Sequence, residues 1–251
     1  MNMAHWESLT WPEIVAARDA VVIIPTGSVE QHGPHLPIGT DTLIAEGITR
    51  LLQESTARHL VVAPSLRYTY AKLNSAYPGT INLSGSTLTN MASDILNELF
   101  RQGFSRVMFV NGHLESIPFI MEGAEISLAS RENGDRGGQA QPKVVIANWW
   151  EYISDEFIDE VFGDRWPGWE AEHAALTETS LMLHLWPDLV RETDTSPRDY
   201  QRFPYRILPW PEKARPASGV YADPRGATPE IGRRLAEIVV AGLDGTIQAE
   251  F

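Results

Sequence analysis

The chain has 251 residues and no cysteine, and its 33 acidic side chains outnumber its 20 lysines and arginines, which gives a formal net charge of −13. Without cysteine, disulfide scaffolds, iron–sulfur clusters and thiolate metal sites are excluded, so any metal must use imidazole and carboxylate ligands. The acidic balance opposes binding to a nucleic-acid backbone, and no apolar run reaches the roughly 20 residues of a membrane span.

The start of the chain and its length set two further expectations. Met1 to Glu7 lack a basic stretch followed by an apolar one, so we expect no signal peptide and a cytoplasmic location. Domains usually hold roughly 100–200 residues, and no clear boundary divides this chain, so we expect a single domain over residues 1–251.

Strand and helix patterns alternate along most of the chain. Thr10 and Glu13 have the spacing of a capping box at the start of a short helix. Short apolar runs predict buried strands at 20–24, 60–63, 106–110 and 143–147. Longer patterns predict helices at 42–56, 86–102, 117–131, 172–185 and 229–247. This alternation predicts an α/β fold with a mostly parallel sheet covered by helices on both faces.

Two segments have neither pattern. Residues 132–141 are polar and rich in glycine, which indicates a surface loop. The proline-rich segment 194–229 is too long for a simple connection between elements. We expect it to wrap the body of the protein or to meet a neighbouring subunit.

Residues that could bind metal follow the predicted strands. In an open parallel sheet, ligands bind beyond the carboxyl ends of the strands. Glu30 and His32 follow the first strand, and His113 and Glu115 follow the third. Side chains two residues apart in extended backbone point the same way, so each pair could reach one place. With Asp41 at the start of the next helix, two imidazoles and three carboxylates would suffice for two divalent ions.

Each of these residues also has an ordinary structural interpretation, which the spacing alone leaves open. Asp41 could cap the helix that follows it, and Glu30 with His32 could be a solvated pair in a loop. His113 could be a turn residue beside Asn111. The tryptophans at 149, 150 and 169 are of a type found more often in cores and interfaces than around ligands.

Several motifs in chain order resemble the creatininase (creatinine amidohydrolase) family. The first and longest is Pro25-Thr26-Gly27-Ser28-Val29-Glu30-Gln31-His32-Gly33, followed by Leu36-Pro37 and Thr40-Asp41. The others are Pro78-Gly79-Thr80, Asn111-Gly112-His113, and Glu172-His173-Ala174 with Glu178-Thr179-Ser180. The resemblance extends from about Leu9 to about Val190.

This resemblance implies a three-layer α/β/α amidohydrolase with two metal ions, commonly zinc or manganese. By the resemblance, Glu30, Asp41 and His113 would hold one ion, and His32, the shared Asp41 and Glu115 the other. A hydroxide bridging the ions would attack the amide carbonyl, and Glu115 is also a candidate for the catalytic machinery.

The same resemblance implies roles for residues around the metals. His173, next to Glu172, would donate a proton to the departing nitrogen, a role suited to imidazole. Trp150 and Trp169 would shield the substrate from water, and the remaining expected substrate contacts are Ser75, Leu114 and Glu170. The family forms ring-shaped homo-oligomers, usually hexamers, so we expect a homo-oligomer.

Two features bear on the substrate. Glu115 supplies a carboxylate as in creatinine-hydrolysing members, whereas Leu114 stands where those enzymes tend to have an aromatic residue. The segment 71–77 is also shorter than the glycine-rich stretch of those enzymes. We expect ring opening of creatinine to creatine, with hydrolysis of a formamide or short peptide as the alternative. A third hypothesis is a non-catalytic protein that binds a small molecule through its tryptophans.

Overall fold

The fold is built on a five-stranded parallel sheet. The computed structural model describes residues 3–132, 141–193, 195, 203, 205 and 207–251. Within these residues the strand order is β1-β3-β2-β4-β5, and every neighbouring pair is parallel. The strands are β1 (Met3–His5), β2 (Val21–Thr26), β3 (Leu60–Val62), β4 (Arg106–Asn111) and β5 (Lys143–Asn148).

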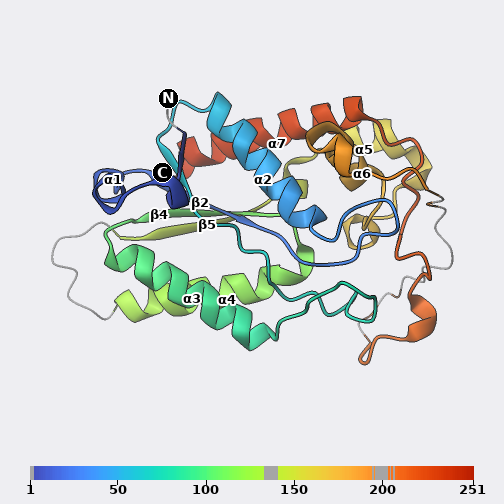
Figure 1. Cartoon of the computed structure of the whole chain (residues 1–251), viewed down its shortest axis with the longest axis horizontal. Coiled ribbons are helices and arrows are strands. Elements are labelled where there is room, and N and C mark those ends of the chain that lie inside the picture. Colours follow the sequence, from blue (N-terminus) through green and yellow to red (C-terminus); the bar gives the residue numbers. More distant parts are fainter. Residues whose placement is uncertain (1–2, 133–140, 194, 196–202, 204, 206) are drawn as a thin grey trace.

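Helices cover both faces of this sheet, as Figure 1 shows. One face carries α2 (Thr40–Ser55), α5 (Asp155–Phe162), α6 (Leu176–Leu185) and α7 (Pro229–Glu250). The other face carries α3 (Gly85–Arg101) and α4 (Ile117–Glu132), while the short α1 (Trp11–Ala16) lies beside β1. The predicted three-layer α/β/α arrangement is therefore confirmed.

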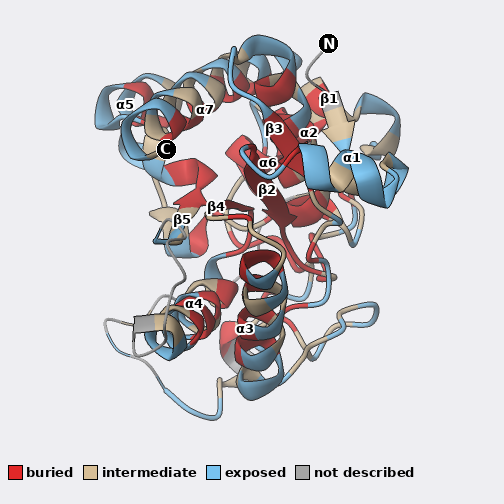
Figure 2. Cartoon of the chain, turned by 90° about the vertical axis from the view of Figure 1, so that its left-hand side faces the viewer, coloured by how far each residue is buried: buried red, intermediate tan, exposed pale blue. Residues whose placement is uncertain are grey.

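The alternation of side chains along β2 explains why both faces are covered. Val21 and Ile23 belong to the apolar cluster under α2, α6 and α7, whereas Val22 and Ile24 belong to the cluster under α3 and α4. All six residues of β2 are buried, and Figure 2 shows burial concentrated on the sheet and on the helix faces turned toward it. A strand with two buried faces needs the continuous apolar run seen in the sequence.

The register of the central strands brings three loops together. Thr26 pairs with Asn111, and Asn111 pairs with Asn148, so β2, β4 and β5 end at the same level. The chain leaves β2 toward α2 on one face and leaves β4 toward α4 on the other. This divergence is the topological switch point at which parallel sheets bind ligands.

Most predicted elements are present, with a few differences at their ends. α2 begins at Thr40 rather than at residue 42, which places Asp41 in its first turn. α6 begins at Leu176 rather than at residue 172, because Ala174 has a positive φ of 54° that interrupts helical backbone. The short strand β1 and helix α5 were not predicted. Most of the predicted loop 132–141, and part of the proline-rich segment, lie outside the described residues.

In the described part of the chain, every helix is too short or too polar to cross a bilayer.

Candidate metal centre

Two glycines let the first turn of α2 approach the strand ends closely. A Cβ added to Gly112 would lie 2.5 Å from the backbone oxygen of Asp41, and one added to Gly27 would lie 2.2 Å from Thr42 N. Only glycine fits at such close backbone contacts. The side chain of Asp41 is thereby brought between the loops that follow β2 and β4.

His32 is held by one ring nitrogen and presents the other to carboxylates. Its Nδ1 lies 3.0 Å from the backbone oxygen of Glu30, which can accept the Nδ1 proton of a neutral ring. Nε2 then carries a lone pair, and it lies 2.8 Å from Asp41 Oδ1 and 3.7 Å from Glu178 Oε2. This buried nitrogen has no hydrogen bond of good geometry to any described residue.

His113 repeats this arrangement from the other strand. Its Nε2 lies 2.9 Å from the backbone oxygen of Tyr70, and its Nδ1 lies 2.9 Å from Asp41 Oδ2 and 3.3 Å from Glu30 Oε2. Asn111, the last residue of β4, orients this loop by accepting a hydrogen bond from His113 N and donating one to His113 O.

These contacts fit metal ligation. A lone pair facing a carboxylate is favourable only when a cation, either a proton or a metal, lies between them. Ligating histidines usually donate the other ring proton to a backbone carbonyl or a carboxylate, as both histidines can here. Asp41 directs one carboxylate oxygen to each histidine, and Ser28 Oγ donates a hydrogen bond to Asp41 Oδ2 at 2.6 Å.

The structure places the remaining carboxylates beside the two histidines in a different arrangement from the one that the resemblance implied. Glu178, not Glu115, has ligand atoms within 4.8 Å of those of His32 and Asp41. Glu115 instead groups with Glu30 and His113. Its carboxylate accepts hydrogen bonds from Leu73 N at 3.3 and 3.0 Å. The structure thus groups Glu178, from the first turn of α6, with His32 and Asp41, whereas the resemblance implied Glu115 at that place.

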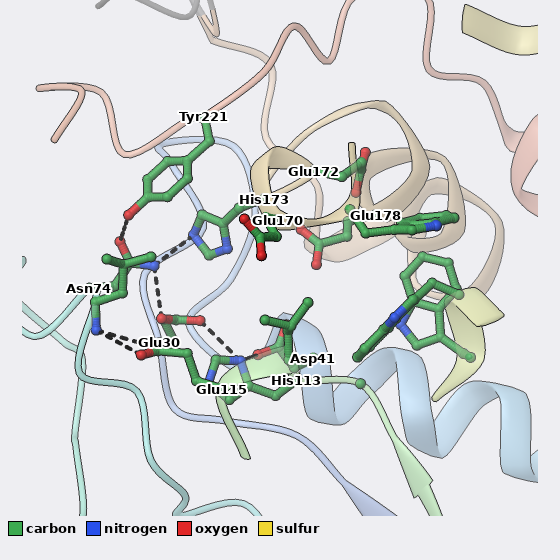
Figure 3. Close-up of a pocket in the computed structure, with 16 residues that line it drawn as sticks. Glu30, Asp41, Asn74, His113, Glu115, Glu170, Glu172, His173, Glu178 and Tyr221 are labelled. Carbon is green, nitrogen blue, oxygen red and sulfur yellow. Dashed lines mark hydrogen bonds and ion pairs between the residues drawn. The ribbon is translucent and has the colours of Figure 1, made fainter. Parts of the chain in front are cut away.

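A cavity of about 80 Å³ opens beside these residues. Six carboxylates line it, and Figure 3 shows them together with His113 and His173 around one space: Glu30, Asp41, Glu115, Glu170, Glu172 and Glu178. No lysine or arginine of the described chain lines this cavity. Trp149, Trp150 and Trp169 line it as well, and Trp149 packs edge-on against the other two with ring centroids 5.8 and 5.7 Å apart.

Comparison with known proteins identifies the family. The family model for creatininase (creatinine amidohydrolase) matches residues 7–247. The chain belongs to the creatininase family. It is 36% identical to a creatinine amidohydrolase from Pseudomonas putida, over 97% of this chain and 95% of that protein. It is also 29% identical to a mycofactocin precursor peptide peptidase from Mycolicibacterium smegmatis, over 99% of this chain and 96% of that one.

Solved creatininase structures match the whole fold. A mutant creatininase in complex with creatine has a TM-score of 0.89 and 32% identity, covering 99% of both chains. A manganese creatininase has a TM-score of 0.88 and 34% identity with the same coverage. A mutant of the Zn–Zn type also has a TM-score of 0.88, with 32% identity over 98% of both chains. This creatininase-family protein is a metal-dependent hydrolase of C–N amide bonds, which contradicts the third hypothesis of a non-catalytic binding protein.

Burial strongly perturbs the acids and bases of this creatininase site in its metal-free form. Burial raises the pKa of Glu30 to about 7 and, together with the neighbouring charge of Glu178, the pKa of Glu172 to about 8. Burial alone would lower the pKa of His113, but the carboxylates of Glu30 and Asp41 raise it to about 10. Without metal, Glu30, Glu172 and His113 therefore all have pKa values above their ordinary ones.

All but one of the expected substrate contacts line the cavity. Leu114, Trp150, Trp169 and Glu170 line the cavity, and Leu114 is 37% exposed at its mouth. Ser75 is not among the lining residues, because its hydroxyl turns away to donate to Lys72 O at 2.8 Å.

The structure distinguishes between the metal-site and the ordinary interpretations of several residues. Asp41 does not cap α2, because Gly39 is the N-cap residue and the Asp41 carboxylate faces the histidines. His113 is a buried residue of the site rather than an exposed turn residue. Trp149 and Trp150 satisfy both interpretations, since they belong to the apolar core and also line the cavity.

Among the lining residues for which the sequence predicted no role are Asn74, Glu178 and Tyr221. Glu178 belongs to one of the family motifs, but a position inside a predicted helix gave no indication that its side chain reaches the site. Asn74 neighbours the predicted Ser75, and Tyr221 lies in the proline-rich segment, for which no structure was predicted.

Proposed function

We propose that this enzyme hydrolyses creatinine to creatine with two divalent ions, zinc or manganese, per chain. Glu30, His113 and Glu115 would hold one ion, His32 and Glu178 the other, and Asp41 would bridge them. The observation that carries this proposal is the pair of buried imidazoles, each facing its own oxygen of the Asp41 carboxylate at 2.8 and 2.9 Å.

The chain's own groups suggest how an amide would be cleaved. When bound, the ions would supply an activated water and a Lewis acid for the carbonyl oxygen. We assign His173, which lines the cavity 4.3 Å from the His32 ring between centroids, to proton transfer to the departing nitrogen. Glu172 accepts from Thr177 N through Oε1, and its buried Oε2 has no hydrogen-bond partner in the described chain. In the absence of metal, burial and the neighbouring charge of Glu178 raise the pKa of Glu172 to about 8.

Charge and size favour a small substrate that is neutral or cationic. Six carboxylates line the cavity, so two doubly charged ions leave a negative balance when most of these acids are ionised. The cavity volume of about 80 Å³ favours a small molecule over a large one. Three tryptophans line the wall, and aromatic rings favour a planar or cationic group such as an amidine. Creatinine has these properties.

The direct test combines metal analysis with turnover of a panel of cyclic amides, formamides and short peptides. We expect two ions per chain in protein purified without chelator, and loss of creatinine hydrolysis after chelation with recovery on addition of zinc or manganese. Less than about one ion per chain, together with no turnover of any compound in the panel, would contradict the proposal.

Replacing His173 with alanine is expected to preserve both ions and to lower kcat on the order of a hundredfold, because the proton donor is lost. The measurements are metal content and kcat on the same preparation. His184→Ala is a matched control, since His184 lies on α6 outside the cavity lining, and it should leave both quantities within about twofold. Full turnover by His173→Ala would remove this residue from the mechanism.

Hydrolysis of a formamide or short peptide is the second candidate. It is favoured by the 29% identity to a mycofactocin precursor peptide peptidase and by Leu114, an aliphatic residue at the cavity mouth. Inhibition assays with creatine and creatinine separate the two. Tight competitive binding of either compound would reject the peptide alternative, whereas rapid peptide cleavage without such binding would favour it.

The homo-oligomer, a hexamer by resemblance, stays a prediction, and so does the cytoplasmic location. Light scattering coupled to gel filtration measures the mass of the assembly directly. A monomeric mass at micromolar concentration would contradict the oligomer.

A further inference from the structure

A short segment near the C-terminus reaches back to the metal centre. We call residues 216–221 the strap. It is anchored by three contacts: Tyr77 donates from its hydroxyl to Pro216 O at 2.5 Å, Gln31 donates from Nε2 to Gly219 O at 3.0 Å, and Tyr221 N donates to His173 O at 3.1 Å. Tyr221 also lines the cavity and lies with its ring 4.8 Å from that of His173 (Figure 3). The strap therefore contributes directly to the site, a role that the sequence did not predict.

The contacts of Gln31 determine how its amide is oriented. Its Oε1 accepts a hydrogen bond from Gly33 N at 2.9 Å, so Nε2 is the end that faces the strap. The two Nε2 protons are directed to Gly219 O and to Asn74 Oδ1, each at 3.0 Å. The close fit requires glycine at 219, where φ is +74° and a Cβ would lie 1.9 Å from Gln31 Oε1.

Two donors then converge on the oxygen of Asn74. Tyr221 donates from its hydroxyl to Asn74 Oδ1 at 2.7 Å, in addition to the bond from Gln31. An amide whose oxygen is held by two donors must present its NH₂ group on the other side. The side chain of Asn74 is buried, so solvent does not compete for these positions.

The NH₂ group of Asn74 faces the metal centre. Nδ2 donates to Glu30 Oε1 at 2.8 Å and lies 3.2 Å from His173 Nε2. The other oxygen of Glu30, Oε2, lies 3.3 Å from His113 Nδ1, on the side of the ligand cluster. Asn74 therefore holds one carboxylate oxygen and leaves the other directed toward the ion.

We propose that Asn74 is a positioning residue that orients the metal ligand Glu30, and that Tyr221 of the strap acts through Asn74 by fixing its amide. The proposal rests on the metal centre proposed above. Partners of this kind typically change metal affinity by 10- to 100-fold when they are removed. The strap would thus set metal affinity from a segment remote in sequence.

The test is a double-mutant cycle with metal affinity as the readout. Zinc and manganese dissociation constants are measured by chelator competition for wild type, Asn74→Ala, Tyr221→Phe and the double mutant, without substrate. We expect Asn74→Ala to weaken binding roughly 10- to 100-fold. Tyr221→Phe keeps the ring and removes one hydrogen bond, so it should weaken binding by roughly three- to tenfold. In the Asn74→Ala background Tyr221→Phe should have no further effect.

Two further variants keep the test decisive. Tyr77→Phe removes the other phenol contact of the strap, and the lost hydroxyl makes no hydrogen bond to the Asn74 side chain, so metal affinity should stay within about twofold of wild type. If Asn74→Ala does not fold, Asn74→Ser replaces it in the cycle, because its side chain is too short to join Tyr221 to Glu30. The proposal is wrong if the two substitutions act additively, or if Tyr77→Phe weakens binding as much as Tyr221→Phe. Because no substrate is used, these outcomes are independent of whether creatinine is hydrolysed.

Discussion

Glu178→Gln is expected to remove one of the two proposed ions and to lower kcat/KM for creatinine, the proposed substrate, by about a thousandfold or more, since such ions supply several kcal/mol of transition-state stabilisation. Glutamine has nearly the same size as glutamate but no negative charge. The Glu178 Oε2 atom lies 3.7 Å from His32 Nε2, and the same oxygen accepts a hydrogen bond from Ala174 N at 2.6 Å, which orients it. Metal analysis should find about one ion per chain instead of two.

This substitution separates two assignments of the ligands. If Glu115 pairs with His32, as the resemblance implied, Glu115→Gln and His32→Ala should empty the same site, and Glu178→Gln should keep both ions. If Glu178 pairs with His32, as the distances indicate, Glu178→Gln should match His32→Ala, and Glu115→Gln should weaken the site of His113.

Glu170→Gln is the matched control for metal content. Glu170 is another carboxylate of the cavity wall, but it belongs to none of the ligand clusters among the described residues. The Glu170→Gln variant should therefore retain both ions. Two ions in Glu178→Gln would contradict the assignment, and one ion in Glu170→Gln would show that the loss is a general effect of cavity charge.

The strands could be predicted from sequence because burial on both faces leaves a continuous apolar run, as in β2. The three-residue strand β1 ends at His5 and has no such run, so only its pairing with β3 reveals it. Helix α5 does have an N-cap signal in the sequence, since Ser154 precedes two acidic residues. In the structure the Ser154 side chain accepts a hydrogen bond from Phe157 N.

The candidate site was predictable only where local spacing carries the information. Glu30 with His32, and His113 with Glu115, follow strands whose ends are necessarily adjacent in a parallel sheet. Glu178 depends instead on where α6 begins, and the positive φ of Ala174 moves that start four residues beyond the prediction.

Tertiary packing alone accounts for the remaining residues of the site. Asn74 and Tyr221 are 147 residues apart and meet through one hydrogen bond. No periodicity links them, because one lies in a loop before α3 and the other in the strap. Ser75 was predicted one position away from Asn74, and the turn that occupies the Ser75 hydroxyl with Lys72 O has no distinct sequence signature.

Removing the ions is expected to lower the thermal midpoint by roughly 15 °C or more at pH 8, and by less at pH 6. An ion present at 1,000 times its dissociation constant stabilises the folded state by about 4 kcal/mol. In a protein of this size each kcal/mol shifts the midpoint by roughly 2–4 °C. Two ions at such saturation therefore give a shift of this order.

The pH dependence follows from the buried acids and bases of the metal-free site. The pKa of Glu30 is about 7 and that of Glu172 about 8 in the folded chain, both above the usual 4.5. A carboxyl with a raised folded pKa stabilises the fold at low pH, and this contribution is lost as pH rises from about 4.5 through 7–8. The pKa of His113 is raised from 6.5 to about 10, so its contribution to the stability of the fold is lost as the pH rises between those two values. These three groups therefore make the metal-free protein less stable from pH 6 to pH 9.

Metal binding has the opposite dependence, because ligands bind as deprotonated carboxylates and neutral imidazoles. The difference in midpoint between metal-loaded and chelated protein should thus widen steadily from pH 6 to pH 9. Calorimetry of both forms across this range, with zinc or manganese restored at each pH, measures that difference. A gap that stays constant or narrows toward pH 9 would mean that protons and metal ions do not compete for these side chains, and the buried carboxylates would then need another partner to compensate their charge.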